Sequence, residues 1–270
     1  MFEPVAGKNP LVSHLRRLSG RRSARVADRA FLVEGATLLD VALDAGAEVS
    51  LVVRDGEVPL TEDVAALAER AAQAGARLVE LAPGAMAKIT DTVTPQPVAS
   101  VVARRPVTLE ALVGDGPPAL PIMVLVGVSD PGNAGTLLRS AEAAGSAGVV
   151  FCAGCVDPFR PKTVRASAGS IFLVPVVEGV EARLVLAALG DHGVPRLGTV
   201  ARGGVALDQA ALAGPVAIVL GNEAHGLPEG LERVLDEVVT IPMSGRAESL
   251  NVAMAGTLMV FEAARRRSDA

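Results

Sequence analysis

The 270-residue sequence predicts an α/β protein whose C-terminal half contains a mostly parallel sheet. Two observations predict this fold class. Short aliphatic runs alternate with segments that carry apolar residues at helical spacing, which is typical of a parallel sheet covered by helices. In addition, the run "IMVLVGV" at 122–128 is continuously apolar, as expected of a strand that is buried on both faces.

The first 103 residues form the first predicted domain, a small α/β unit. Its expected helices have periodic apolar residues and end at a glycine, and they cover 9–20, 36–46 and 61–75, the last with Thr61 as N-cap. Its expected strands cover 30–35, 48–53 and 76–81, and a short helix, a turn and a final strand follow within 83–103.

A second predicted domain covers 120–270, after a linker over 104–119 that is rich in Pro and Gly and has no clear period. Further strands are expected over 148–152, 171–177, 195–201, 216–221 and 237–242. Helices are expected over 134–145, 161–170, 181–190, 228–236 and 249–267.

Composition excludes several classes of protein. Trp and Tyr are absent, which argues against the aromatic platforms that bind single-stranded nucleic acid. There is no apolar N-terminal leader and no uncharged apolar run long enough to span a membrane, so we expect a soluble, cytoplasmic protein. Cys152 and Cys155 are the only cysteines, and the three histidines have no ligand spacing, so we expect reduced thiols and no metal site.

Basic residues cluster near the N-terminus although the chain has a net charge of −5. Between positions 8 and 29 the sequence has seven basic residues and one acid, Asp28: Lys8, Arg16, Arg17, Arg21, Arg22, Arg25 and Arg29. This pattern is compatible with a solvated helix or with an arm that contacts phosphate groups. The acidity of the rest of the chain favours the arm.

Three loops that follow predicted strands are rich in glycine and asparagine, and ligands of α/β folds bind at such positions. In "VSDPGNAGTLLRS", Asn133 is either a helix N-cap or a site residue, and Arg139 is either a surface or a site residue. In "VLGNEAHGL", Gly221 would let the backbone approach a ligand closely, and Glu223 is either a loop acid or functional.

The third loop, "IPMSGRAESLN", leads into the last predicted helix. Ser249 would cap this helix, which would place Asn251 inside the first turn, where a short polar side chain is unusual. That mismatch favours a functional role. The sequence has no dinucleotide fingerprint, no complete phosphate loop and no recognisable nucleophile motif.

Taken in order, "PGNAGTLLRSAEAAG", "VLGNEAHGL" and "IPMSGRAESLNVAMAGTLMVFEAARRR" resemble the signature motifs of the SpoU (TrmH-type) RNA ribose methyltransferases of the SPOUT superfamily. The segment "DPFRPKTVRASAGSIFLVPVV" is also similar to this family. The first domain, with "FLVEG" and "TPQPVASVV", looks more loosely like a ribosomal-protein-like substrate-binding domain. The resemblance implies a deep trefoil knot, a homodimer and S-adenosylmethionine bound in the knot.

The resemblance also implies roles for individual residues. Asn133, Arg139, Glu223, Ser249 and Asn251 match the polar active-site set of the family. Cofactor contacts are implied for Leu220, Gly221, Ile241, Met243 and Leu250. Arg has too high a pKa to act as a base, so we expect Arg139 to orient the ribose or to stabilise charge.

RNA is the implied partner, with ribosomal RNA favoured, and the expected phosphate contacts include Arg16, Arg17, Arg21, Arg22, Arg25 and Arg165. We expect neither membrane nor metal as a partner. Three alternatives remain open: a transfer-RNA 2′-O-methyltransferase, a catalytically silent RNA-binding protein of the same fold, and an unrelated nucleotide-binding enzyme.

Overall fold

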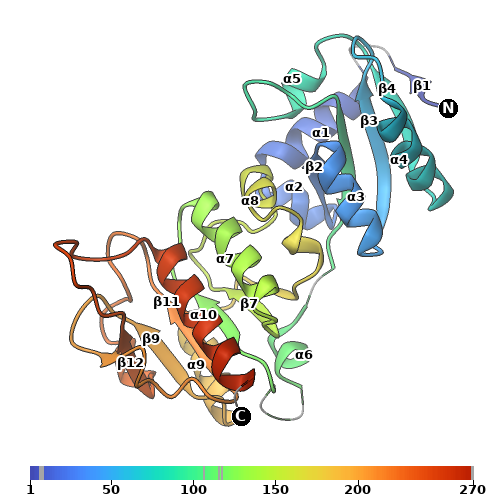
Figure 1. Cartoon of the computed structure of the whole chain (residues 1–270). Helices are drawn as coiled ribbons and strands as arrows, with labels where there is room; N and C mark the ends of the chain where they lie inside the picture. The colour runs from blue at the N-terminus through green and yellow to red at the C-terminus, as the bar shows by residue number, and fades with distance from the viewer. Residues whose placement is uncertain (6–8, 106, 115, 117, 269–270) are drawn as a thin grey trace. The chain divides into compact units, whose positions relative to one another are not determined.

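The computed structural model describes residues 1–5, 9–105, 107–114, 116 and 118–268, which form two compact units (Figure 1). Unit 1 comprises Met1–Arg105 together with Phe159–Phe172. Unit 2 comprises Pro106–Pro158 and Leu173–Ala270. The chain therefore leaves unit 2 at Phe159 and returns to it at Leu173. The predicted boundary, which assigned all of 120–270 to the second domain, did not include this excursion.

Unit 1 contains a five-stranded mixed sheet with the strand order β1-β4-β3-β5-β2, in which β5 is antiparallel to both neighbours. Its elements are β1 (Glu3–Pro4), α1 (Pro10–Gly20), α2 (Arg22–Ala27), β2 (Ala30–Glu34), α3 (Ala36–Asp44), β3 (Val49–Asp55), α4 (Glu62–Gln73), β4 (Arg77–Leu81), α5 (Met86–Ile89), β5 (Val98–Ala103), α8 (Pro161–Ala166) and the 3₁₀ turn η1 (Ser170–Phe172). The helices and strands predicted within the first 103 residues are present, and β1 and α2 are additional.

Helix α1 begins where its sequence provides a cap. The Asn9 side chain accepts a hydrogen bond from the Leu11 N–H at 2.9 Å, and Pro10 occupies the first turn. Leu15 and Leu18 are fully buried against the sheet. Thr61 precedes α4 as predicted, but its side chain forms no capping hydrogen bond.

The segment Phe159–Phe172 packs within unit 1. The Phe31 ring lies 5.0 Å from the Phe159 ring and 6.0 Å from the Phe172 ring, measured between centroids. The predicted strand over 171–177 is therefore wrong at its start, because Phe172 belongs to a 3₁₀ turn that packs on β2. The strand that follows, β8, covers only Val176–Glu178.

Unit 2 contains a seven-stranded sheet with the order β10-β12-β9-β11-β6-β7-β8, and all of its pairs are parallel. Its elements are α6 (Leu109–Val113), β6 (Ile122–Leu125), α7 (Pro131–Ala143), β7 (Gly148–Phe151), β8, α9 (Ala182–Asp191), β9 (Arg196–Thr199), β10 (Val205–Ala206), β11 (Ala217–Leu220), η2 (Glu232–Val234), β12 (Glu237–Thr240) and α10 (Val252–Ser268). The predicted helix over 228–236 is wrong, because only the short turn η2 forms there. The predicted parallel sheet is confirmed.

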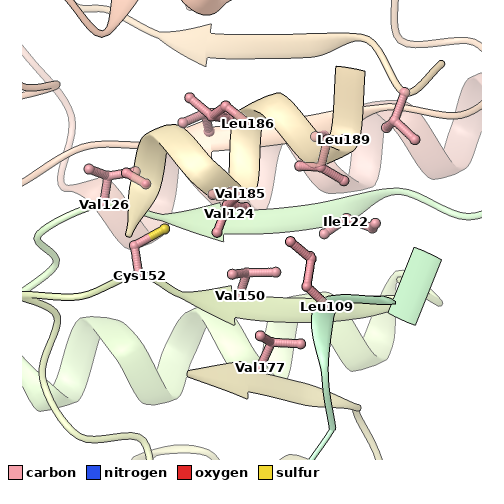
Figure 2. Close-up of a cluster of buried hydrophobic side chains, with 14 of the residues drawn as sticks. Leu109, Ile122, Val124, Val126, Val150, Cys152, Val177, Val185, Leu186 and Leu189 are labelled. Carbon is pink, nitrogen blue, oxygen red and sulfur yellow. The ribbon is translucent and has the colours of Figure 1, made fainter. Parts of the chain in front are cut away.

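Helices cover both faces of this sheet. On one face, Val185, Leu186 and Leu189 of α9 pack over strand residues such as Ile122 and Val124 (Figure 2). On the other face, α7 and α10 pack against each other, and the Thr257 hydroxyl lies 2.7 Å from that of Ser140. None of the helices in the described part of the chain is both long and apolar enough to cross a membrane.

The predicted linker over 104–119 contains helix α6, which belongs to the core of unit 2. The Thr108 hydroxyl caps α6 by accepting a hydrogen bond from the Ala111 N–H at 3.1 Å. Leu109 and Val113 are 7% and 5% exposed, and both belong to the cluster around α9. Figure 2 shows Leu109 in this cluster. These two buried apolar side chains fix α6 in the core of unit 2, whereas Pro and Gly are concentrated in the turns on either side of the helix.

We predict that Leu109→Ala lowers the free energy of unfolding by about 2–5 kcal/mol, because it leaves a cavity in this cluster. Urea unfolding of the full chain measures the change. Leu120→Ala is the matched control, because Leu120 is 37% exposed, and it should have little effect. Equal midpoints for wild type and Leu109→Ala would contradict a structural role for α6.

Candidate functional site

A pocket of about 690 Å³ lies in unit 2, where the carboxyl ends of β9, β11 and β12 meet their loops. This volume is typical of a small-molecule site, and the carboxyl edge of a parallel sheet is the usual place for one. Six predicted site residues line it: Gly221, Glu223, Ile241, Met243, Ser249 and Leu250. They come from segments that are up to 29 positions apart in the sequence (221 to 250).

Leu220 does not line the pocket, although the prediction places it close to the cofactor. It is fully buried at the end of β11. A methyl group added at Gly256 would lie 2.6 Å from a Leu220 methyl carbon and 2.4 Å from one of Leu137. Leu220 therefore supports the close packing of α10 on the sheet, and any effect on the pocket is indirect.

Gly221 is required by the turn of the chain that follows it. A Cβ atom at this position would lie 2.3 Å from the Gly226 carbonyl carbon. The glycine thus allows the loop 222–226 to fold back on itself. This role is separate from the predicted one, in which Gly221 lets the backbone approach a ligand closely.

Asn222 holds that loop closed, and the predicted site set does not include it. Its backbone exchanges two hydrogen bonds with Gly226, at 2.8 and 2.9 Å. Its side-chain oxygen accepts from the N–H groups of Ala224 and His225, and its amide donates to the Gly127 carbonyl at 2.7 Å. The sequence signal was an asparagine directly after a strand-end glycine.

Glu223 accepts hydrogen bonds from the loop that follows β6. The donors are the Ser129 N–H and hydroxyl, the Asp130 N–H at 3.0 Å and the Asn133 side-chain amide at 3.1 Å. Partial burial alone would raise the pKa of Glu223, but the bonds from Asp130, Asn133 and Ser129 outweigh it and lower the pKa to about 2. The carboxylate is therefore ionised at neutral pH and acts only as an acceptor.

Asn133 is not the N-cap of α7. Asp130 is the cap, and its carboxylate accepts from the Asn133 N–H at 2.8 Å. The Asp-Pro pair at the start of the helix was the sequence signal for this cap. The Asn133 side chain is therefore available to donate to Glu223 and to accept from the Asn251 amide at 2.9 Å.

Asn251, and not Ser249, caps helix α10. The Asn251 side-chain oxygen accepts from the Ala253 N–H at 2.8 Å, and α10 begins only at Val252. The expectation that Asn251 lies inside the first turn is wrong, because the helix starts three residues later than predicted. Ser249 instead lies exposed on the pocket wall, and its hydroxyl has no hydrogen-bond partner within the residues the structure describes.

Arg139 lies outside this network. It is exposed on α7, six residues after Asn133 and therefore about a third of a turn away around the helix. In the described ranges, its guanidinium forms no ion pair or hydrogen bond. The structure thus brings together Asn133, Glu223 and Asn251, and leaves Arg139 free for a ligand.

Two predicted RNA contacts have partners within unit 1. Arg25 is 3% exposed and donates to the carbonyls of Leu18 and Ser19, so it cannot reach a phosphate group directly. Arg165 forms ion pairs with Glu34 at 3.0 Å and with Asp91 at 2.7 Å, so two carboxylates already compensate its charge. Both arginines were predicted from sequence proximity to other basic residues, which does not reveal partners.

The remaining basic residues of the cluster lie on or next to the first helices. Arg16, Arg17, Arg21 and Arg22 are exposed. Lys8 lies outside the described residues.

The two cysteines are free thiols, as expected. Burial raises the pKa of Cys152 to about 12 and also raises the pKa of Cys155, which favours the protonated, unreactive forms. Across the described part of the chain, no cluster of three or more potential metal ligands is found.

Comparison with known proteins gives consistent matches over nearly the whole chain. The sequence profile of the SpoU rRNA Methylase family matches residues 121–261, and that of the MRM3-like substrate binding domain matches residues 9–100. A curated relative, the 23S rRNA (guanosine(2553)-2′-O)-methyltransferase RlmP of Bacillus subtilis (strain 168), is 30% identical over 261 residues, which cover 97% of this chain and 98% of the relative.

Two solved structures with bound AdoMet have the same fold. One is an rRNA methyltransferase from Sinorhizobium meliloti, with a TM-score of 0.85 and 31% identity over 98% of each chain. The other is the SpoU methyltransferase AviRb from Streptomyces viridochromogenes, with a TM-score of 0.87 and 27% identity over 97% of this chain and 100% of that one.

We predict that Asn133→Ala raises the pKa of Glu223 from about 2 toward its ordinary value of 4.5, because the carboxylate loses a donor. Carbon-13 NMR titration of the labelled glutamates measures this pKa. Because the folded-state pKa is depressed, the stabilisation is complete above about pH 4.5 and is lost as the pH falls toward 2. Arg139→Ala, on the same helix, is the control, and an unchanged Glu223 pKa in Asn133→Ala would contradict the bond.

Proposed function

The chain belongs to the SpoU rRNA methylase family, and we propose that it transfers a methyl group from S-adenosylmethionine to a ribose 2′-oxygen of ribosomal RNA. One observation in the structure supports this most directly. Glu223 lines the pocket at the carboxyl edge of the sheet, and it is held by the Asn133 amide, which in turn accepts a hydrogen bond from Asn251. Such an arrangement provides fixed polar groups beside a partly apolar cavity.

The residues of the pocket fit S-adenosylmethionine. Ile241, Met243 and Leu250 offer apolar surface for an adenosyl group, and the loops after β9 and β11 offer backbone donors and acceptors. When bound, S-adenosylmethionine supplies an activated sulfonium methyl group. The contribution of this chain is to hold the methyl group and the ribose 2′-oxygen in line for transfer.

The polar residues divide into two groups. Glu223, Asn133 and Asn251 satisfy one another, so we infer that they position the loops that form the pocket. The Ser249 hydroxyl and the Arg139 guanidinium have no partner within the described residues, so we infer that they face the RNA. The Arg139 guanidinium would stabilise negative charge at the 2′-oxygen or at a neighbouring phosphate.

Ribosomal RNA is the favoured substrate because the Bacillus subtilis relative, which aligns along the whole chain, is named as a 23S rRNA methyltransferase. A ribose 2′-OH is present only in RNA, which excludes DNA as the acceptor. A transfer-RNA substrate and a catalytically silent RNA-binding protein remain the alternatives. Methyl transfer to the two kinds of RNA separates all three.

We further propose that the chain between β12 and α10 forms part of a deep trefoil knot around the pocket, that two copies form a homodimer, and that the protein acts in the cytoplasm, where ribosomal RNA is available in bacteria. An apolar stripe on α10 supports the homodimer. Met254, Leu258 and Phe261 are 62%, 46% and 46% exposed, and their spacing places them on one helix face. A second copy of this helix would cover such a stripe.

We expect wild-type protein to transfer labelled methyl from S-adenosylmethionine to ribosomal RNA stripped of protein, and not to transfer RNA. Label that survives removal of the bases identifies ribose methylation. Arg139→Ala should lose at least about a hundredfold in turnover, because one electrostatic stabiliser of the reacting oxygen is absent. Full turnover of Arg139→Lys would show that a simple positive charge suffices and that the guanidinium fork is not required.

Leu258→Glu should convert the protein from dimer to monomer, because a charge would replace the centre of the apolar stripe. Light scattering coupled to size exclusion measures the mass. Leu184→Glu is the matched control, because Leu184 is 64% exposed on α9 and is not part of the stripe. A wild-type protein that is monomeric at micromolar concentration would contradict the proposed homodimer.

A further inference from the structure

A groove of about 980 Å³ lies in unit 1, between α1 and α5. Arg16, Arg17 and Arg21 border it on the α1 side, and Lys88 borders it from α5. Lys88 is 67 positions beyond Arg21 in the sequence (88 minus 21), so it was not part of the basic cluster that the sequence predicts. Helices α1 and α5 lie side by side (Figure 1).

Apolar packing fixes where these positive charges lie. Leu15 and Leu18 of α1 share one buried cluster with Met86 and Ile89 of α5. Because these four residues face the core, Arg16, Arg17 and Lys88 are exposed beside the groove. The α1–α5 contact thus brings cations from two segments to one place.

Buried Arg25 supports the same arrangement. Its guanidinium donates to the Leu18 carbonyl at 2.5 Å and to the Ser19 carbonyl at 2.9 Å, and so satisfies carbonyls in the last turn of α1. A cation at this end of a helix also opposes the negative end of the helix dipole. Arg25 therefore holds the turn that carries Arg21, although it cannot contact RNA itself.

The four groove cations differ from several other arginines of unit 1. Arg54, Arg70, Arg77 and Arg165 each pair with a carboxylate. By contrast, Arg16, Arg17, Arg21 and Lys88 form no ion pair within the residues that the structure describes. Like charges that are held together without counterions favour binding of a polyanion.

The chemistry of the groove selects the kind of polyanion. Besides the cations, its walls carry small or hydroxyl side chains such as Ser13, Ala87 and Thr90, and no aromatic residue. Bases therefore have no surface to stack on, whereas phosphate oxygens find several donors. A positively charged groove of this type follows a sugar–phosphate backbone and does not read sequence.

We propose that the α1–α5 groove binds the sugar–phosphate backbone of structured RNA, with Lys88 as a direct phosphate contact that the methyl-transfer step does not require. The proposal rests on the proposed function only for the identity of the polyanion as RNA. It adds a contact from α5 to the N-terminal arginines and assigns Arg25 a positioning role.

The test is fluorescence anisotropy of the full chain with two labelled RNA hairpins of the same fold, the second with every base pair inverted, over a series of salt concentrations. Lys88→Ala should weaken binding of both hairpins equally. It should also reduce the slope of log affinity against log salt by about one, as expected for one lost phosphate contact. Lys88→Arg should restore most of the affinity.

Arg77→Ala is the matched control, because it removes one exposed positive charge from the same unit outside the groove. It should leave the slope unchanged. The proposal is overturned if Arg77→Ala weakens binding as much as Lys88→Ala, if Lys88→Ala keeps the wild-type slope, or if the two hairpins differ strongly. Inorganic phosphate at matched ionic strength should compete no better than chloride, and strong competition would instead indicate a small-anion site.

The same proteins are titrated with S-adenosylmethionine by calorimetry, and cofactor affinity should be equal in wild type and Lys88→Ala. The hairpin measurements need no cofactor. Absent cofactor binding would therefore count against the proposed methyl transfer alone, whereas failure of the groove proposal would appear in the hairpin measurements.

Discussion

The Asn133 side chain joins two polar groups that are far apart in the sequence, donating to Glu223 and accepting from Asn251. An amide can make both bonds at once only if its partner on the donating side is an acceptor, and the ionised Glu223 carboxylate guarantees this. The orientation then passes to Asn251, whose oxygen caps α10. One chain of hydrogen bonds thus links the start of α7, the loop after β11 and the start of the last helix, and the last two of these segments contribute residues to the pocket wall.

Positively charged side chains serve two purposes in this molecule, and the presence or absence of an intramolecular partner distinguishes the two groups. Arg25 and Arg165 satisfy carbonyl or carboxylate groups and hold the fold together. Arg139 and the groove cations lack such partners in the described part of the chain and remain available to a ligand. Partly buried pairs such as Arg165–Glu34 are costly to break, because one charge would remain unpaired in a dry environment. Exposed, unpaired cations contribute little to folding, so their arrangement is better explained by what they bind.

Much of this was predictable from the sequence. The parallel sheet followed from aliphatic runs such as 122–128, and a resemblance in three loops pointed to Asn133, Glu223 and Asn251, which the structure brings together. Local sequence patterns gave the wrong secondary structure where contacts between distant residues determine it. Phe172 leaves its strand-like run because it packs on Phe31, and α6 forms inside a Pro-rich stretch because Leu109 has a core to enter. Helix α10 starts at Val252 because Asn251 caps it, and the Asn251 side chain is oriented by donating a hydrogen bond to Asn133, which lies 118 positions earlier. Lys88 could not be assigned to the basic cluster without knowing that α5 packs on α1.

The segment Phe159–Phe172 has a consequence for how such a protein is inherited. Its residues complete unit 1, yet they are encoded within the stretch that builds unit 2. A genetic crossover near residue 105 would join a first domain from one parent to the segment Phe159–Phe172 from another. The residues at positions 31 and 34 would then have to pack against Phe159 and pair with Arg165 without having evolved together with them. Recombination therefore cannot exchange one unit without disturbing contacts inside unit 1. We expect the two units to have diverged together in evolution.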